Sequence, residues 1–221
     1  LCALSSPASA DELSWSATAT GTSDYIFRGL SLNNEDPAFQ ASIDAEYGIW
    51  YAGLWGSMVD DGAAYEPVEL NLYAGVKPVV GPVTFDFGVI YYFYPWADDS
   101  NGDIFELKAA FDWSPVDKLT LSPAVYWIPD QSNADSTTTY EGTAAYELPA
   151  VGVFAPSVSG TVGWTEADVE YTYWNAGLAL AVEKFTFDFR YWDTDINDDP
   201  ASAYVGLSDE RFVFTASITL P

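Results

Sequence analysis

The chain has 221 residues, of which 49% are hydrophobic and 17% aromatic, and its 33 Asp and Glu against 7 Lys and Arg give a formal net charge of −26. This balance argues against nucleic acid as a partner, because phosphate groups are bound by basic side chains. The sequence holds no His and one Cys. An internal disulfide is therefore excluded, along with most histidine-based metal and triad chemistry, and we predict no cofactor.

The N-terminal residues resemble the tail of a secretory signal peptide. Ala8-Ser9-Ala10 gives a small-x-small cleavage pattern immediately before Asp11 and Glu12. We interpret residues 1–10 as a signal-peptide remnant, the alternative being an ordinary disordered N-terminus. Residues 11–221 contain no linker and no block of charge, so we predict that they form a single domain.

Beyond this point, apolar and polar residues alternate with the period of two that is typical of β-strands. In residues 185–192, for example, Phe, Phe, Phe and Tyr alternate with Thr, Asp, Arg and Trp. The segments reach about ten to twelve residues, the length that a tilted strand needs to cross a bilayer, whereas strands of soluble sandwiches are about half as long. In chain order, the predicted strands cover residues 13–28, 37–47, 49–58, 66–77, 82–93, 103–113, 118–128, 138–148, 153–164, 170–182, 185–192 and 209–220.

The predicted connections alternate between short and long. The short ones are residues 48, 78–81, 114–117, 149–152 and 183–184. The long ones are polar, rich in acids and cover residues 29–36, 59–65, 94–102, 129–137, 165–169 and 193–208. An even number of strands with short turns at one end and longer loops at the other is typical of bacterial outer-membrane barrels. The longest uncharged stretch, residues 148–165, contains Pro149 and Pro156 and does not fit a membrane helix.

We therefore predict an all-β fold, namely a single closed antiparallel transmembrane β-barrel of about 12 strands, because in lipid only a closed sheet satisfies every backbone group. The expected location is the outer membrane of a Gram-negative bacterium, among the lipid bilayer and lipopolysaccharide, with both termini in the periplasm. Eight of the nine Trp, all but Trp55, fall near a predicted strand end, as in the aromatic girdles of such barrels. A soluble sandwich with a large aromatic core is the alternative.

The basic residues mark the inner face of the predicted barrel. Lys118 and Lys184 fall at turns, and the other five fall on the polar phase of a strand. We predict pore-lining side chains at Asp24, Arg28, Asp44, Glu46, Glu69, Asp86, Glu106, Lys108, Asp112, Glu141, Asp188, Arg190 and Arg211. Each interior base either neutralises neighbouring acids structurally or belongs to a constriction that selects solutes, the second role fitting Arg28 and Arg190 best. The phase of residues 49–58 is ambiguous, because both faces are apolar.

The sequence gives little support for catalysis or metal binding. Without His, an enzyme would depend on paired carboxylates, and pairs such as Asp98 and Asp99 fall in solvated loops, so we predict that the protein is not an enzyme. The loop that begins at Asp193 lacks the Gly and the Glu that an EF-hand needs at its sixth and twelfth positions. A looser divalent-cation site is the one metal candidate, and its residues are Asp193, Asp195, Asp198 and Asp199.

Several segments resemble a known family, the TorF-type porins of proteobacteria. The similar segments are residues 23–29 (Ser-Asp-Tyr-Ile-Phe-Arg-Gly), 36–40 (Asp-Pro-Ala-Phe-Gln) and 51–57 (Tyr-Ala-Gly-Leu-Trp-Gly-Ser), Glu69 before Tyr73-Ala74-Gly75, Tyr191-Trp192-Asp193-Thr194 and the closing strand from Arg211. The chain departs from the family at Leu32, where Gln is usual, and at its end, Leu220-Pro221, where an aromatic residue is usual. The resemblance implies an outer-membrane, porin-like barrel.

Together these patterns predict a porin for passive diffusion of small hydrophilic solutes, with a preference for cations because acids outnumber bases in the lumen and loops. Side chains fill much of a barrel of this size, so we expect a narrow or partly plugged pore. The main alternative is a non-conducting outer-membrane barrel with a structural or surface-interaction role. A soluble acidic β-sandwich that binds a partner is the third possibility.

Overall fold

The computed structural model of the chain describes residues 12–60, 67–95, 103–132, 134–196 and 206–221, and the predicted signal-peptide remnant lies outside these ranges. The strands within them are β1 (Ser14–Thr22), β2 (Ile26–Phe27), β3 (Leu30–Ser31), β4 (Ala38–Tyr47), β5 (Trp50–Met58), β6 (Val68–Val76), β7 (Val79–Val80), β8 (Val83–Phe93), β9 (Ile104–Val116), β10 (Leu119–Ile128), β11 (Thr137–Glu147), β12 (Ala155–Glu166), β13 (Tyr171–Val182), β14 (Phe185–Thr194) and β15 (Arg211–Leu220). No helix long and apolar enough to cross a membrane occurs among the described residues.

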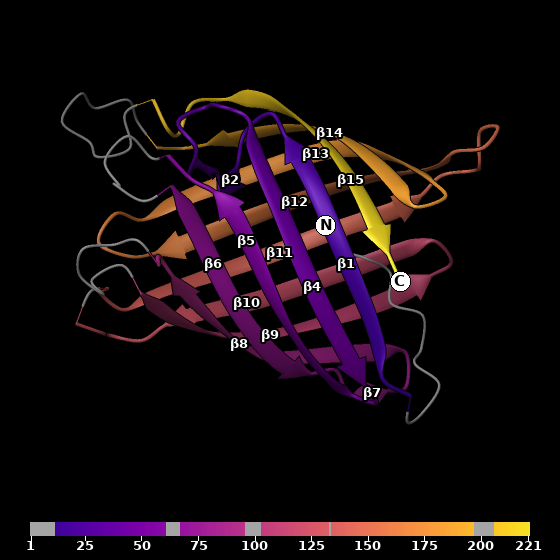
Figure 1. Ribbon diagram of the computed structural model, residues 1–221, viewed down its shortest axis with the longest axis horizontal. Coiled ribbons are helices and arrows are strands. Elements are labelled where there is room, and N and C mark those ends of the chain that lie inside the picture. The colour runs from indigo at the N-terminus through magenta and orange to yellow at the C-terminus, as the bar shows by residue number, and fades with distance from the viewer. Residues whose placement is uncertain (1–11, 61–66, 96–102, 133, 197–205) are drawn as a thin grey trace.

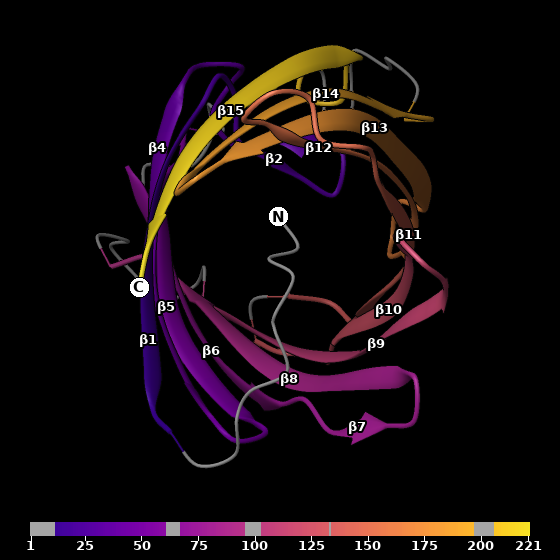
Figure 2. The same cartoon turned by 90° about the vertical axis from the view of Figure 1, so that its right-hand side faces the viewer.

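The long strands close into a barrel of 12 antiparallel strands. The first and last of them, β1 and β15, pair with each other, and Thr18 lies opposite Thr219. In the sheet β6 pairs directly with β8, because the short β7 lies between them only in the sequence. In Figure 2, viewed along the barrel, the strands form a continuous ring with β2 inside it. The predicted fold class and strand number are therefore confirmed.

The outer surface of the barrel is apolar. Large side chains on it keep much of their area exposed, for example Phe212 at 82% and Trp50 at 63%. Along β14, the exposed Phe189 alternates with Asp188 and Arg190, which form a hydrogen-bonded ion pair on the other face. Lipid is the solvent that such an outer surface requires, so the closed barrel indicates a location in the bacterial outer membrane.

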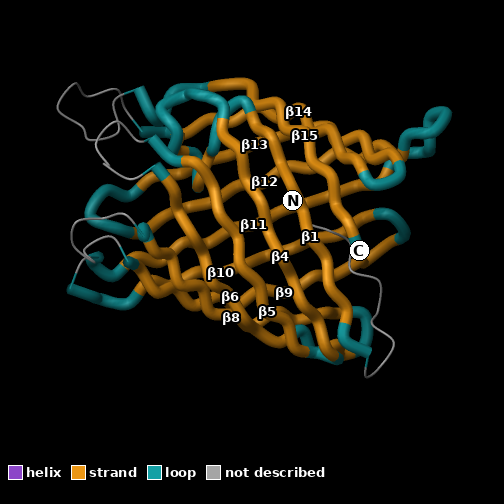
Figure 3. Tube along the Cα trace, viewed as in Figure 1, coloured by secondary structure: helices purple, strands orange, loops and turns teal. Residues whose placement is uncertain are grey.

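The connections alternate in length as predicted with one exception, because the connection over residues 148–154, predicted to be short, is longer than the one over residues 167–170, predicted to be long. Figures 1 and 3 show the short turns at one end of the barrel, called here the turn end, and the longer connections at the other, called the loop end. Several short turns use a backbone with positive φ, as at Gly48 (58°), Lys118 (67°) and Glu183 (53°). Tight hairpins require such values to match the twist of their strands. The placement of Lys118 and Lys184 at turns is confirmed.

The predicted strand over residues 13–28 is wrong beyond Thr22. There β1 ends, and residues 23–37, called here the lumen loop, turn into the barrel and form the hairpin of β2 and β3. Side chains compete with the sheet at this point: Thr22 Oγ1 donates to the carbonyl of Asp24 (2.7 Å), and Ser31 Oγ donates to the Asp24 carboxylate (2.7 Å). Asp24 and Arg28 therefore belong to the loop and not to the barrel wall.

The phase of β5 is settled by its register with β4. Tyr51 lies opposite Glu46 and Gly53 opposite Asp44, so the odd-numbered residues of β5 face the lumen. Trp55 consequently points inward, where its ring centroid lies 5.3 Å from that of Tyr25 in the lumen loop. This packing explains why Trp55 alone departs from the pattern of Trp near strand ends.

Candidate functional site

The inside of the barrel is polar, and near the loop end it is shielded from solvent. Glu106 is 0% exposed and Glu69 is 2% exposed. Other buried polar side chains there are Asn71, Thr139, Thr165 and Asn175. The lumen loop accounts for this burial, because it crosses the lumen and contacts strands on several sides.

The lumen loop takes its shape from the turn between Arg28 and Gly29. Both residues have positive φ, 51° and 85°, as the two-residue turn of a β-hairpin requires. A Cβ atom on Gly29 would lie 2.6 Å from Thr194 Cγ2 and 2.7 Å from Tyr173 Cβ. Glycine therefore allows the tip of the hairpin to rest against β13 and β14.

Arg28 extends from this turn to Glu106 on β9. Its Nη2 lies 2.8 Å from Glu106 Oε2, and its guanidinium group lies over the rings of Phe27 (4.6 Å) and Tyr126 (4.8 Å). Burial by itself lowers the pKa of Arg28, but the Glu106 carboxylate together with Tyr92 and Tyr173 outweighs burial and raises the pKa above its ordinary value. Because the pair is buried, loss of either partner leaves an uncompensated charge.

Glu69 on β6 is buried beside the lumen loop but has no basic partner. Its carboxylate accepts hydrogen bonds from the hydroxyls of Tyr25 (3.2 Å) and Tyr94 (2.9 Å) and from Asn71 Nδ2 (2.8 Å). In the part of the chain that the structure describes, no Lys or Arg nitrogen lies within 4.0 Å of it. Burial raises the pKa of Tyr25, and the Glu69 carboxylate raises it further. Neutral donors thus hold this carboxylate.

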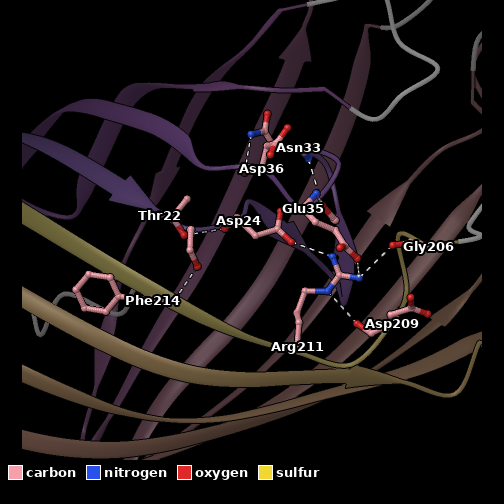
Figure 4. Close-up of polar contacts among 11 residues, drawn as sticks. Thr22, Asp24, Asn33, Glu35, Asp36, Gly206, Asp209, Arg211 and Phe214 are labelled. Carbon is pink, nitrogen blue, oxygen red and sulfur yellow. Dashed lines mark hydrogen bonds and ion pairs between the residues drawn. The ribbon is translucent and has the colours of Figure 1, made fainter.

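A second anchor holds the base of the lumen loop. Arg211, at the start of β15, pairs with Asp24 (2.9 Å) and with Glu35 (3.1 Å). Figure 4 shows the same guanidinium group donating to the carbonyl oxygens of Gly206 and Asp209. Arg211 therefore connects the lumen loop to the connection that precedes the last strand.

Toward the turn end, the lumen side chains are more exposed. Lys108 Nζ lies 2.7 Å from Asp86 Oδ2, and Lys77 Nζ lies 3.4 Å from Glu46 Oε1, with side chains of the second pair 35% and 41% exposed. A cavity of about 220 Å³, called here the lumen cavity, is lined by residues of both pairs and by Asp44. Open space and charge thus coincide in this half of the barrel.

Arg190 lies on the opposite wall. Its guanidinium group donates to Asp188 (Nε to Oδ1 3.1 Å, Nη2 to Oδ2 2.9 Å), to Asn175 Oδ1 (2.5 Å) and to Ser159 Oγ (2.9 Å). The side chains of the ion pair are 18% and 14% exposed. This arrangement holds the guanidinium group in one position while part of it still faces the lumen.

The structure places the predicted interior residues around the lumen and reveals how their charges are arranged. Each interior base, Lys77 included, pairs with an acid of the predicted set. Among the acids of the predicted set, all of which lie in the described residues, four lack a basic partner and accept hydrogen bonds from neutral groups, namely Asp44, Glu69, Asp112 and Glu141. That these residues line a conducting pore stays a prediction.

Tyrosines are the site residues that the sequence analysis missed. Tyr73 donates to Asp44, Tyr173 to Glu141 and Tyr51 to Asp86. Each ring lies over glycine on a neighbouring strand, and a Cβ on Gly53 or Gly163 would overlap the ring of Tyr73 or Tyr173 respectively. In the sequence, such a residue is a Tyr on the inward face of a strand whose neighbouring strand carries a Gly. This pattern can be recognised only when the register of the two strands is known.

The candidate metal site is only partly within the described residues, because Asp198 and Asp199 lie outside them. Asp193 accepts hydrogen bonds from the Tyr191 hydroxyl and the Thr194 amide, and Asp195 accepts one from the Thr172 amide. Among the described residues, no group of three or more Asp, Glu, Cys or His side chains is arranged to hold a metal ion. The site stays a prediction.

Comparison with known proteins gives a family and a fold. The sequence matches a family described as "Bacterial protein of unknown function (Gcw_chp)" over residues 5–220. No curated protein matches the sequence. The structure is similar to the KdgM porin in complex with disordered oligogalacturonate, with a TM-score of 0.64 and 6% identity over 93% of this chain and 99% of that one.

Two further solved structures are similar. The NanC porin gives a TM-score of 0.60 at 12% identity and covers 92% of this chain and 100% of its own. LpxR from Salmonella typhimurium gives a TM-score of 0.53 at 9% identity and covers 94% of this chain and 99% of its own. At such low identities the likeness establishes the outer-membrane barrel fold alone.

Proposed function

The chain belongs to the Gcw_chp family of bacterial proteins of unknown function, and from its geometry we propose that it is an outer-membrane porin for passive diffusion of small hydrophilic solutes. The observation that carries this proposal is a closed barrel whose polar lumen is narrowed at one end by an inward loop and contains open, charged space toward the other. Solutes that enter such a lumen meet hydrogen-bonding groups and ion pairs, as in known channels. The sequence resemblance to TorF-type porins supports the same function.

We further propose that the pore prefers cations. In the described part of the lumen every base is paired, whereas several acids have only neutral donors, so negative charge is in excess. An acidic lumen raises the local concentration of cations and repels anions. Oligogalacturonate, the ligand of KdgM, is a polyanion, and the acidic lumen supports a different solute class here.

A channel is favoured over an enzyme by the side chains available. The chain has no His to act as a general base. The buried carboxylates Glu69 and Glu106 lie against the lumen loop and are held by Tyr25 and Arg28 respectively. A non-conducting structural barrel is the second candidate, and the depth to which the lumen loop enters the barrel is the observation that favours it.

Planar-bilayer recording of the refolded chain tests these proposals. We expect small single-channel steps and, in a KCl gradient, a reversal potential that favours K⁺. The preference should weaken as the Debye length falls from about 10 Å at 0.1 M to about 3 Å at 1 M salt. Heat-modifiable migration on a gel provides the control for folding. A folded barrel without steps points to the structural role, and anion preference contradicts the charge argument.

A further inference from the structure

The lumen cavity has walls made from five neighbouring strands. Its volume is about 220 Å³, and it is lined mainly by Asp44, Glu46, Tyr51, Tyr73, Asp86 and Lys108. These residues lie on the inward phase of β4, β5, β6, β8 and β9, toward the turn end. Sites for drug-sized ligands span about 300–1,000 Å³, so this cavity suits a more compact solute.

The charges of the lumen cavity are not balanced. Lys108 is paired with Asp86, and Lys77 with Glu46. Asp44 accepts hydrogen bonds from the hydroxyls of Tyr73 and Ser42, and within the described residues no basic nitrogen lies within 4.0 Å of it. An ionised carboxylate has about four lone-pair sites, so Asp44 retains acceptor capacity toward the cavity.

The aromatic walls of the lumen cavity are held in place by glycine. A Cβ atom on Gly53 would lie 2.4 Å from the Tyr73 ring, and a Cβ on Gly75 or Gly88 would lie 2.5 Å from the Tyr51 hydroxyl. The rings thus occupy space that any other residue would fill. Lys77 Nζ lies 4.7 Å from the centroid of the Tyr51 ring, so an ammonium group of the protein already occupies the face of this ring, whereas no such contact is made to the Tyr73 ring among the described residues.

From this combination we propose that the lumen cavity binds a compact solute that carries one ammonium group. Asp44 is the charge partner of that group, and the Tyr73 ring, whose hydroxyl donates to Asp44, forms the aromatic wall beside it. The paired Lys108 and Asp86 offer hydrogen bonds to the polar remainder of the solute. This inference rests on the proposed porin function and specifies the class of solute that pauses in the pore.

Binding is tested separately from conduction. Ethanolammonium is titrated onto the refolded full chain in detergent and followed by the broadening of its own NMR signals, with uncharged ethylene glycol and anionic glycolate as matched probes. We expect ethanolammonium to bind, and Asp44→Asn to weaken its binding about tenfold or more, equivalent to about 1.4 kcal/mol.

Asp112→Asn removes another lumen carboxylate without a basic partner, and it should weaken binding less than about twofold if long-range charge contributes little. Ile90→Phe fills part of the cavity and keeps every charge, and we expect it to abolish binding.

Each outcome is decisive. The proposal is overturned if ethanolammonium does not bind, if glycolate or ethylene glycol binds equally well, or if Asp44→Asn and Asp112→Asn weaken binding by the same factor. Heat-modifiable migration verifies that each variant is folded, and Ile90→Phe tests the site by an independent change. Binding without channel activity would refute the porin function and retain the site. Channel activity without binding would refute the site and retain the porin function.

Discussion

The loop end and the turn end of the same lumen hold their charges in different ways. Near the loop end, the side chains of Arg28 and Glu106 are 8% and 0% exposed, whereas those of Lys77 and Glu46 near the turn end are 35% and 41% exposed. A buried ion pair is costly to break, and an exposed one contributes little to stability. The same pattern, a base facing an acid inside a barrel, therefore fixes the lumen loop at one end and leaves exposed charges around open space at the other.

Arg28→Ala should have the largest effect, because it leaves the buried Glu106 without its partner. The cost is on the order of 3–5 kcal/mol while the lumen loop stays docked, so we expect the loop to leave the lumen and the single-channel conductance to rise. Amide hydrogen exchange of residues 26–31, read beside the conductance, measures this release. Lys77→Ala is the matched control, since it breaks an exposed pair and should change the free energy of unfolding by at most about 1 kcal/mol. Unchanged exchange and conductance in Arg28→Ala would show that the buried pair does not hold the loop.

Gly29→Ala should have the next largest effect. The added Cβ would meet Thr194 and Tyr173 at 2.6 and 2.7 Å in a backbone with φ of 85°. A left-handed conformation alone costs about 1–2 kcal/mol for a residue with a side chain, and here the overlap adds to it. Gly48→Ala has a φ of 58° and no atom within 4 Å of the new Cβ, so it isolates the conformational cost. Urea unfolding and conductance should separate the two, and equal effects in both variants would contradict packing of the hairpin tip against the wall.

Arg190→Ala should have a smaller effect on stability and a visible one on selectivity. Its ion pair with Asp188 is partly exposed, and its other partners are neutral. We expect a loss on the order of 1–3 kcal/mol, typical of hydrogen bonds to charged groups, together with higher conductance and stronger cation preference. Urea unfolding and reversal potentials on one preparation measure both quantities. A loss of stability without a change in conductance or selectivity assigns Arg190 a structural role only.

The alternation of apolar and polar side chains along the sequence was sufficient to predict the barrel. Because successive residues of a strand face opposite sides, the phase of Phe189 against Arg190 reveals which face meets lipid and which meets the lumen. The strand count, the apolar outer surface and the inward direction of the charged residues that lie on the barrel strands follow from this local rule. It requires no knowledge of which strand lies beside which.

Tertiary structure alone decided which segment enters the lumen and which side chains pair inside it. The sequence predicts that the first strand continues over residues 23–28, yet they form part of an inward hairpin, because side-chain hydrogen bonds at Thr22 and Asp24 turn the chain and the tip packs on distant strands. The pairing of Arg28 with Glu106 and the seating of Tyr73 over Gly53 depend on register and closure, which bring together residues far apart in the chain. Periodicity reports the face of the sheet on which a side chain lies, but which partners it meets across a closed barrel is set only when the ring forms.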